Sequence, residues 1–426
     1  MTLLLFGLFL LLLLCEMPVA FSIGVSSSVV VLLSERLPPT FIVSKIFAGL
    51  DSFPLMAIPF YILAGNLMSE GGLTVKIVSF ANALVGHVRG GLAHVVVVAA
   101  AIFSGVSGSA AADTAAIGSI MIPSMKKRGF HADFAVSLVA SACTMGPIIP
   151  PSILFIVYGS LAQVSVGQLF LAGFLPGAVM AGMLMVFAYA IARRRGYARA
   201  HPRFSARRAV ETLAGAGWAL LVPVIIIGGI VGGWFTPTEA GVVAVAYALF
   251  VAMVVQRTVR VRDLRRIFVE SAVMTSIVML ILGPATVFGS LLIRDHFPER
   301  VLALLTRITA DATTSIFLML GFIVALGFFV DVMVMIIMFA QPFAHVAARL
   351  GYDAVHFGVV FTLAATIGGI TPPVGGLLFV ACSIGRIGLT EASRAIWPFV
   401  VALLAVTAVL VLVPPITTVV PRLVFP

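Results

Sequence analysis

The chain is a series of long apolar stretches separated by short polar segments. A helix needs about 20 mostly apolar residues to cross the hydrocarbon core of a bilayer, and a charge near its centre costs roughly 2.5–3.5 kcal/mol on insertion scales. Stretches without charge therefore predict membrane-spanning helices. They predict about eleven crossings, near residues 2–15, 17–34, 52–69, 77–88, 134–192 (two crossings), 212–238, 240–256, 271–293, 354–385 and 395–421.

Two further apolar stretches are each divided by one acidic residue. Asp113 interrupts the stretch at about 90–125, and Asp331 interrupts the stretch at about 312–348. About 35 residues are too many for one crossing and too few for two crossings with a loop. Each stretch therefore predicts a re-entrant hairpin of two half-helices. Membranes tolerate such a backbone only inside protein or beside a water-filled cavity.

The composition excludes a soluble fold. Of 426 residues, 61% are hydrophobic and 10% are charged, whereas soluble domains carry about 25% charged residues. The net charge of +10 does not indicate nucleic-acid binding, because the basic residues lie in short segments between apolar stretches, as in the positive-inside pattern. We therefore predict an all-α polytopic membrane protein in a lipid bilayer.

Basic residues also predict the orientation. Seven arginines lie in the segment 193–208, five lie in the segment 257–266, and residues 126–128 are Lys-Lys-Arg. All three clusters are cytoplasmic if the N-terminus is cytoplasmic and each hairpin returns to its own side. The apolar run at 3–14 is then a first crossing rather than a signal peptide, since no lysine or arginine precedes it.

The two halves of the chain match at a fixed offset of 222 residues. The segment GFHADFAVSLVASACTMGPIIPP (129–151) aligns without a gap with GYDAVHFGVVFTLAATIGGITPP (351–373). We therefore predict a first half, 1–210, and a second half, 211–426. Each half holds one hairpin and one broken helix, and the broken helices are expected at about 132–158 and about 354–380. In the predicted topology the matching helices run in opposite directions, so the repeat is inverted, as in many secondary transporters.

In each half this match ends in a glycine followed by two adjacent prolines. The motifs are GPIIPPS at 146–152 and GGITPPVG at 368–375. Proline lacks a backbone donor and collides with the carbonyl one turn earlier, so both motifs interrupt a helix in mid-membrane. Freed carbonyls coordinate a hard cation such as Na⁺, and the half-helix N-terminus faces an anion. A kink without a ligand is the alternative, but two motifs in symmetric places favour ion sites.

Small residues dominate the segment FSGVSGSAAADTAAIGS (103–119). They permit close backbone approach and the serines add hydroxyl oxygens, so we expect a hairpin tip that lines a substrate or ion cavity; a plain packing face is the alternative. Intramembrane Asp113 and Asp331 are functional candidates by default, and capping of a half-helix stays open for both. Glu239, which follows Pro237 at the start of a crossing, is expected to cap its helix.

Seven short motifs follow one another along nearly the whole chain. They are LDSFPLMAIPFYILAGNLMSEGG (50–72), GHVRGGLAHV (86–95), SGVSGSAAADTAAIGSIMIPSM (104–125), MGPIIPPSILFIVYG (145–159), FLAGFLPG (170–177), FTPTEAG (235–241) and TPPVGGLLFVA (371–381). In combination and in this order they closely resemble the large membrane subunit, DctM-like, of the tripartite ATP-independent periplasmic (TRAP) transporters.

The resemblance implies an elevator-type fold, in which a transport domain built from inverted repeats moves against a scaffold. It implies Na⁺-coupled import of an organic acid, a carboxylate, that a periplasmic substrate-binding protein delivers at the bacterial inner membrane. It also implies a separate small four-helix membrane subunit, DctQ-like, as a partner. Na⁺ is then the coupling ion, and no other cofactor is implied.

The resemblance also implies site residues. Carried over by motif, one sodium site would use Ser104, Ser107, Gly146, Ile149 and Pro150, and the other would use Gly327, Gly368, Thr371 and Val374. Ser107, Asp113 and Ser152 are the candidates for contact with the substrate.

Other functions compete with this interpretation. An intramembrane aspartyl protease would use Asp113 and Asp331, but the sequence LGFFVD around Asp331 lacks the pattern G-x-G-D of such enzymes. A secondary transporter of another elevator family, independent of a binding protein, is the main alternative. ATP drive is not supported, because no phosphate-binding loop G-x-x-x-x-G-K-[ST] occurs. We therefore predict a transporter and not an enzyme.

Overall fold

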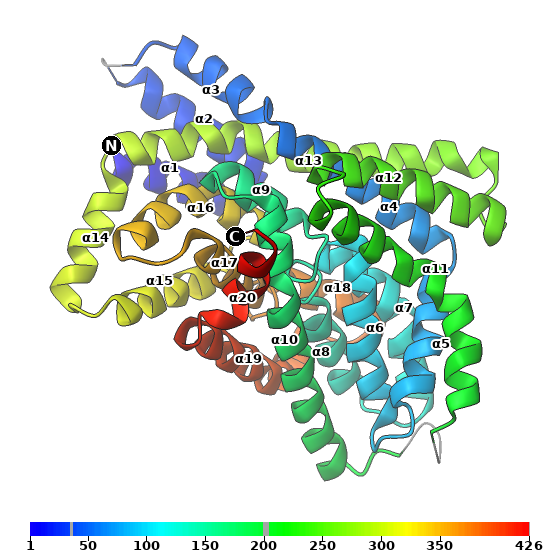
Figure 1. Cartoon of the computed structure of the whole chain (residues 1–426). Helices are drawn as coiled ribbons and strands as arrows, with labels where there is room; N and C mark the ends of the chain where they lie inside the picture. The colour runs from blue at the N-terminus through cyan, green and yellow to red at the C-terminus, as the bar shows by residue number, and fades with distance from the viewer. Residues whose placement is uncertain (35–36, 199–203, 426) are drawn as a thin grey trace.

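Every regular element is a helix in the residues that the computed structural model describes, which are 1–34, 37–198 and 204–425 (Figure 1). The first half contains α1 (Thr2–Leu14), α2 (Val19–Leu32), α3 (Thr40–Leu50), the 3-10 helix η1 (Phe53–Met56), α4 (Ala57–Glu70), α5 (Leu73–Val85), α6 (Gly91–Ser107), α7 (Ala110–Lys127), α8 (Ala132–Cys143), α9 (Ile153–Ala162) and α10 (Val166–Arg194). The second half contains α11 (Ala206–Val231), α12 (Pro237–Phe250), the π-helix η2 (Val251–Val255), α13 (Val261–Arg294), α14 (Phe297–Ile308), α15 (Ala312–Leu326), α16 (Val332–Arg349), α17 (Ala354–Gly368), α18 (Gly376–Gly385), α19 (Leu389–Leu412) and α20 (Pro415–Val424). The expected all-α membrane class is confirmed.

Among the described residues, six helices are long and apolar enough to cross a bilayer, or eight if two bent pairs each count as one crossing. The pairs are α3 with the helix that starts at η1, bent by 59°, and α14 with α15, bent by 120°. The eleven expected crossings include stretches that the structure divides, since 134–192 forms three helices and 354–385 forms two. Hydropathy records apolar length, but tertiary packing decides where a helix breaks.

The hydropathy pattern does not predict α3 or α14. Lys45 lies in α3, and Glu299, Arg300 and Arg307 lie in α14, so neither helix is a stretch without charge. Both are short and belong to the bent pairs. Charge-free length is therefore a sound marker for a straight crossing and a poor one for a short helix beside a bend.

The longest helix, α13, organises one part of the molecule. It packs along α1, α2 and α3 over one portion and along α4 over another, while α12 lies on α4 (Figure 1). Small residues allow the close approach: a Cβ on Gly24 of α2 would lie 3.4 Å from Pro284 Cβ of α13. A capping box begins α12, where Glu239 N donates to Thr236 Oγ1 at 3.3 Å and Thr236 N donates to Glu239 Oε2 at 2.8 Å. The expected capping role of Glu239 is confirmed.

The hairpins and broken helices follow the offset of 222 residues that the sequence shows. α7 and α16 begin 222 positions apart, at 110 and 332, and also end 222 positions apart, at 127 and 349. Gly129 and Gly351, which follow these helices, share a left-handed φ of +81°, a conformation that glycine adopts without steric cost. The peptide bonds Pro150–Pro151 and Pro372–Pro373 are both cis. We call each hairpin with its broken helix a unit. The two units contact each other, because α7 packs on α18 and α16 packs on α9.

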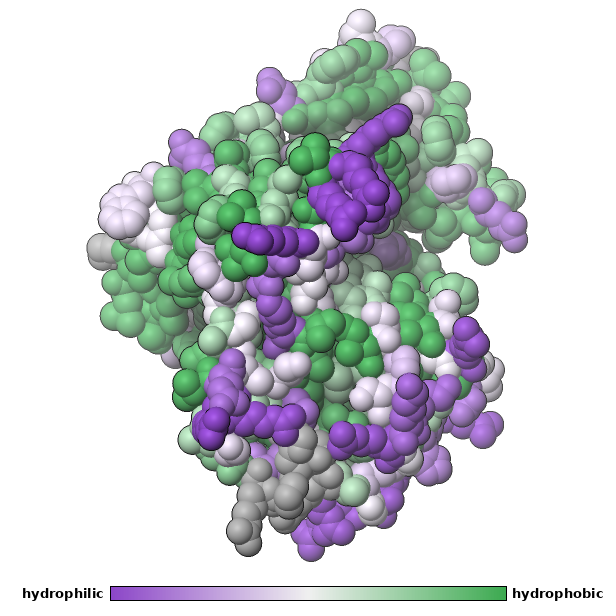
Figure 2. Space-filling model, turned by 90° about the vertical axis from the view of Figure 1, so that its right-hand side faces the viewer, coloured by the Kyte–Doolittle hydropathy of each residue, from purple (hydrophilic) through white to green (hydrophobic). Residues whose placement is uncertain are grey.

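The surface is that of a membrane protein. Figure 2 shows the side formed largely by α5, α11 and α12, where apolar residues cover much of the upper part and polar residues gather across the middle and at the lower end. Large apolar side chains are exposed on α11 and η2, among them Val224 (62%) and Val254 (56%). Part of the arginine-rich segment, residues 199–203 with Arg199 and Arg203, lies outside the described residues. The cytoplasmic location of this segment and of the N-terminus stays a prediction.

Candidate functional site

The first hairpin meets the first broken helix at a tip built from small residues. α6 ends at Ser107, and Gly108 turns the chain toward α7 with a φ of +63°. A Cβ on Gly108 would collide with the carbonyl oxygen of Pro151, and Ile153 N donates to the carbonyl of Gly108 at 3.3 Å. Glycine therefore lets the hairpin tip lie directly on the double proline.

Asp113 lies in the first turn of α7 and is fully buried. It accepts one hydrogen bond from Ser104 Oγ at 2.9 Å and another from Ser107 Oγ. Gly146, just after α8, approaches from another side, since a Cβ there would lie 2.6 Å from Asp113 Oδ2. The cap of α7 is Ser109 rather than Asp113. The structure thus brings Ser104, Ser107 and Gly146 together around one carboxylate.

The carboxyl group of Asp113 has no basic partner among the described residues. No ion pair between described residues includes Asp113. Desolvation of an ion costs several kcal/mol, and a hydrogen bond to a charged group contributes about 1.5–3 kcal/mol. Carboxylate and hydroxyl oxygens are ligands that hard cations prefer. The cluster of Asp113, Ser104 and Ser107 can therefore offer a cation both negative charge and oxygen atoms.

The other residues predicted near this tip lie in or after the break between α8 and α9. Ile149 is half-buried and Pro150 is buried. Ser152 is also buried and caps α9, because its Oγ accepts from Phe155 N at 3.1 Å and donates to the carbonyl of Pro147 at 2.5 Å. The hydrogen bonds of Ser152 thus stay within the broken helix and give it a structural role.

The second hairpin meets the second broken helix through two glycines. A Cβ on Gly327 would collide with the backbone of Gly368, and a Cβ on Gly368 would approach Gly327 Cα to 2.6 Å. Val374 N donates to the carbonyl of Phe328 at 3.2 Å, which ties this tip to the chain after the double proline. Ile153 makes the equivalent connection in the first unit.

The second unit differs from the first in charge. Thr371 is fully buried and donates its hydroxyl to the carbonyl of Ile367 at 2.7 Å, so lone pairs of its Oγ1 remain available. Asp331, by contrast, is exposed and caps α16 by accepting from Met333 N at 2.9 Å. Of the two alternatives that the sequence leaves open, capping is therefore the observed role of Asp331 but not of Asp113.

Apart from Asp331, the exposed side chains of α7 and of the start of α18 near the two tips are small or apolar. Val374 and Phe379 are 52% and 63% exposed, on either side of the start of α18, and α18 packs on α7. The exposed positions of α7 in this region are Ala111, Ala112, Ala115 and Ser119. The three predicted substrate contacts, Ser107, Asp113 and Ser152, are all buried in this conformation.

Sequence reasoning missed the neighbours of the first tip on α4 and α11. A Cβ on Gly65 would lie 3.3 Å from Ser107 Cα, and a Cβ on Gly105 would lie 3.4 Å from Pro223 Cγ. Gly65 belongs to the apolar segment ILAGN, and a small residue in such a helix is a common sign of close helix packing. That signal could have indicated a contact but not its partner.

These features define a class of protein. No hydrogen bond or ion pair within the described part of the chain joins Asp113 to Asp331, and no group of three His, Cys, Asp or Glu side chains there could hold a metal ion. Two hairpins, each pressed on a broken helix inside an all-helical membrane protein, are instead the architecture of a secondary transporter.

Comparison with known proteins identifies the family. Residues 6–416 match the family model of the tripartite ATP-independent periplasmic transporter, DctM component, and the chain belongs to this family. It is 38% identical over 412 residues to the sialic acid TRAP transporter large permease protein SiaM of Vibrio cholerae, with 97% of this chain and 96% of that protein covered. It is 33% identical over 412 residues to the isethionate TRAP transporter permease protein DctMQ of Oleidesulfovibrio alaskensis, with 97% and 65% covered. The expectation of a TRAP permease rather than an enzyme is confirmed.

A solved structure has the same fold. The crystal structure of the YdaH transporter from Alcanivorax borkumensis, described as revealing an unusual topology, matches with a TM-score of 0.67 and covers 96% of this chain and 97% of that chain. The sequence identity is 13%, so this likeness concerns the fold alone.

Proposed function

We propose that this chain is the substrate-translocating subunit of a Na⁺-coupled importer in a bacterial inner membrane. The observation that carries the proposal is the buried carboxylate of Asp113, which accepts hydrogen bonds from Ser104 and Ser107 and has no basic partner among the described residues. A monovalent cation bound there neutralises the charge, and the carboxylate needs no further desolvation because it is already inside the protein.

Each hairpin and its broken helix then hold one Na⁺. The first site takes oxygens from Ser104 and Ser107 and backbone carbonyls at Gly146, Ile149 and Pro150, beside Asp113. The contacts of Asp113 support a role in this cation site rather than direct contact with the substrate.

The second site takes the Thr371 hydroxyl and carbonyls at Gly327, Gly368 and Val374. It has no buried carboxylate of its own among the residues that the structure describes, so its ligands are all uncharged. Uncharged oxygens suit a monovalent ion better than a divalent one, since less ligand charge is needed to offset its loss of water.

The substrate is a small organic acid. The two relatives named above are a sialic acid permease and an isethionate permease, and both named solutes are small organic anions. In this chain the substrate would be held between the tips, where α7 packs on α18. Na⁺ bound in the same unit favours an anionic substrate through its positive charge.

The partners follow from the family. This chain spans 65% of the DctMQ relative, which supports a second membrane unit as a partner, here a separate four-helix subunit. A periplasmic binding protein delivers the substrate on the outer side, opposite the arginine-rich segment 193–208, and the N-terminus is cytoplasmic. Transport proceeds by an elevator movement of the hairpins and broken helices against the helices arranged along α13.

Reconstitution tests the proposal. The chain, its small membrane subunit and the cognate binding protein, loaded with the ligand that a thermal-shift screen identifies for it, are combined in proteoliposomes. Uptake should require both an inward Na⁺ gradient and the loaded binding protein. Full uptake in sodium-free buffer with only a proton gradient would contradict Na⁺ coupling, and full uptake without the binding protein would contradict the tripartite assignment.

A further inference from the structure

The helices pack into two groups. The first group is α1–α4 with η1 and α11–α13 with η2, arranged along α13, and the second group is α6–α10 and α15–α20, which includes both hairpins and both broken helices (Figure 1). α5 and α14 contact both groups. This division raises the question of what holds one group against the other.

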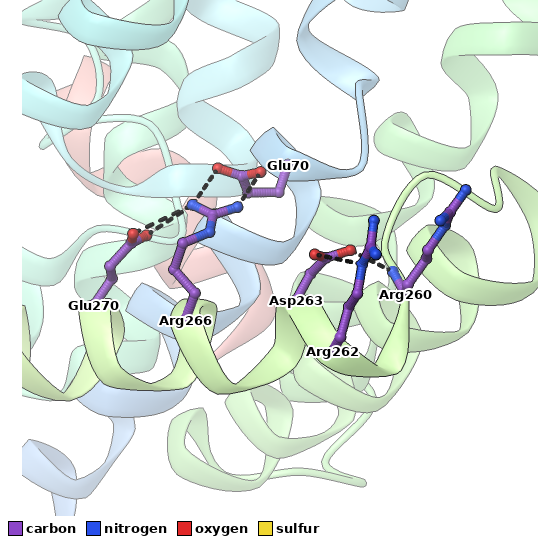
Figure 3. A network of polar contacts seen from close by, with 6 residues as sticks. All are labelled: Glu70, Arg260, Arg262, Asp263, Arg266 and Glu270. Atoms are coloured by element: carbon purple, nitrogen blue, oxygen red, sulfur yellow. Dashed lines mark hydrogen bonds and ion pairs between the residues drawn. The ribbon is translucent and has the colours of Figure 1, made fainter.

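Hydrogen bonds and ion pairs between side chains hold helices of the first group together. Figure 3 shows the guanidinium of Arg266 on α13 between the carboxylates of Glu70 and Glu270, and the Nη2 of Arg266 lies 2.9 Å from Oε2 of Glu70 on α4. Farther along the same pair of helices, Asn66 Nδ2 donates to Ser271 Oγ at 2.8 Å. Two polar contacts thus fix α4 to α13.

Polar contacts also hold helices of the second group together. Arg195, after α10, makes two hydrogen bonds to Asp133 of α8 at 3.1 and 3.2 Å. Lys126 of α7 donates to the carbonyl of Gly385 on α18 at 3.0 Å, which connects the first hairpin with the second broken helix. Such bonds favour movement of this group as one body.

Few polar contacts between described residues cross the boundary between the groups. Apart from the interactions of Ser34, Arg128 and Arg208, one hydrogen bond between described residues crosses it, with Ser52 Oγ 2.8 Å from Ser160 Oγ. Ser52 precedes η1 in the first group, and Ser160 lies near the end of α9 in the second. Both residues are half-buried.

Small and apolar residues also meet at the boundary. Gly65 of α4 faces the backbone of Ser107, with 3.3 Å from its Cβ position to Ser107 Cα. Phe6 of α1 stacks on Phe339 of α16 with ring centroids 6.1 Å apart. Contacts of this kind re-form after a shift, so a packed interface can slide without leaving a buried polar group unsatisfied.

We propose that the hydrogen bond between Ser52 and Ser160 is a latch that holds the described conformation, and that it opens when the second group slides past the first. The proposal rests on the elevator movement proposed above and adds the pair of residues that sets its equilibrium. Side-chain hydrogen bonds between membrane helices change an equilibrium by about 3- to 15-fold. Loss of the latch should therefore change the equilibrium constant between the two conformations by that factor.

Distance measurement between spin labels on the two groups tests the latch. Trp234 in the first group is 79% exposed and Lys127 in the second group is exposed, so Trp234→Cys and Lys127→Cys provide the labelling sites. Cys15 is exposed and is replaced by alanine, while the other two cysteines are buried. The full chain and its small subunit are placed in nanodiscs in NaCl buffer. Electron spin resonance then reports the fraction of molecules at each distance between the two labels.

Two latch variants and one matched control decide the outcome. Ser52→Ala and Ser160→Ala each remove the same bond. Both should therefore change the ratio of the populations at the two distances by about 3- to 15-fold in the same direction. Asn66→Ala removes a hydrogen bond of equal length, 2.8 Å, inside the first group, and should leave the ratio unchanged.

The latch would be overturned by an unchanged ratio in both serine variants or by an equal shift in Asn66→Ala. A single distance in every sample would also overturn it. These distances are measured without transport. Failure of the unaltered protein to take up substrate with Na⁺ would therefore count against the proposed function alone.

Discussion

Replacement of Thr371 by valine tests the second cation site most cleanly. The Thr371 hydroxyl is buried and donates to the carbonyl of Ile367 at 2.7 Å, which leaves its oxygen lone pairs free to accept a cation. Valine nearly keeps the shape of threonine. The change therefore removes one oxygen atom from the proposed site and disturbs the packing little.

The size of the effect follows from the loss of one ligand. Leaving a partner unsatisfied in a dry site costs about 1–3 kcal/mol. That corresponds to a rise of about 5- to 150-fold in the Na⁺ concentration that gives half-maximal uptake. The bond to Ile367 is lost as well, which lowers the free energy of unfolding by about 0.5–1.5 kcal/mol but does not by itself change Na⁺ affinity.

Thr366, in the preceding helix α17, provides a matched control. It is also fully buried, and its Oγ1 donates to the carbonyl of Thr362 at 2.6 Å, but it lies inside α17, whereas Thr371 lies in the break after that helix. Thr366→Val should therefore lower stability about as much as Thr371→Val and leave Na⁺ dependence unchanged. Uptake against Na⁺ concentration, normalised to protein in the membrane, and the melting temperature separate the two effects. Equal Na⁺ curves for both variants would refute the assignment of Thr371.

Three further predictions concern the first site, the second tip and the topology. Ser107→Ala removes a donor to the buried carboxylate and a proposed ligand, so it should also raise the half-saturating Na⁺ concentration about 5- to 150-fold; an unmoved curve speaks against the first site. Gly327→Ala should destabilise the chain by about 1–3 kcal/mol or more through overpacking, whereas Gly321→Ala, which meets nothing within 4 Å, should cost less, as thermal melting can show. In intact cells a membrane-impermeant maleimide should label Trp234→Cys and not Phe204→Cys, and the opposite pattern would reverse the predicted orientation.

Much of the architecture could be predicted because its signals are local. Charge-free length indicates a membrane protein, a lone acid inside an apolar stretch indicates a hairpin, and a glycine followed by two prolines indicates a broken helix. The offset of 222 residues between the halves reappears in the bounds of α7 and α16. Apart from this offset, each of these signals depends on residues within one short segment.

The features that could not be predicted depend on tertiary contacts. Asp113 and Asp331 each divide an apolar stretch of the sequence, but Asp113 is fully buried beside Gly146 and Asp331 is an exposed helix cap. The residues near each aspartate in the chain do not predict which of the two will pack against a distant glycine. The same holds for Gly65, whose partner at Ser107 lies on another helix.

Entry of Na⁺ together with the substrate tests the central claim most directly. Radioactive Na⁺ and labelled substrate are counted in the same proteoliposomes, with the small subunit and the loaded binding protein present and with the binding protein alone omitted as the control. Two cation sites predict that the substrate stimulates Na⁺ entry, with two Na⁺ for each substrate molecule, and that Thr371→Val weakens both fluxes together. Substrate uptake without any stimulated Na⁺ entry would contradict the claim that the two units bind and carry the coupling ion.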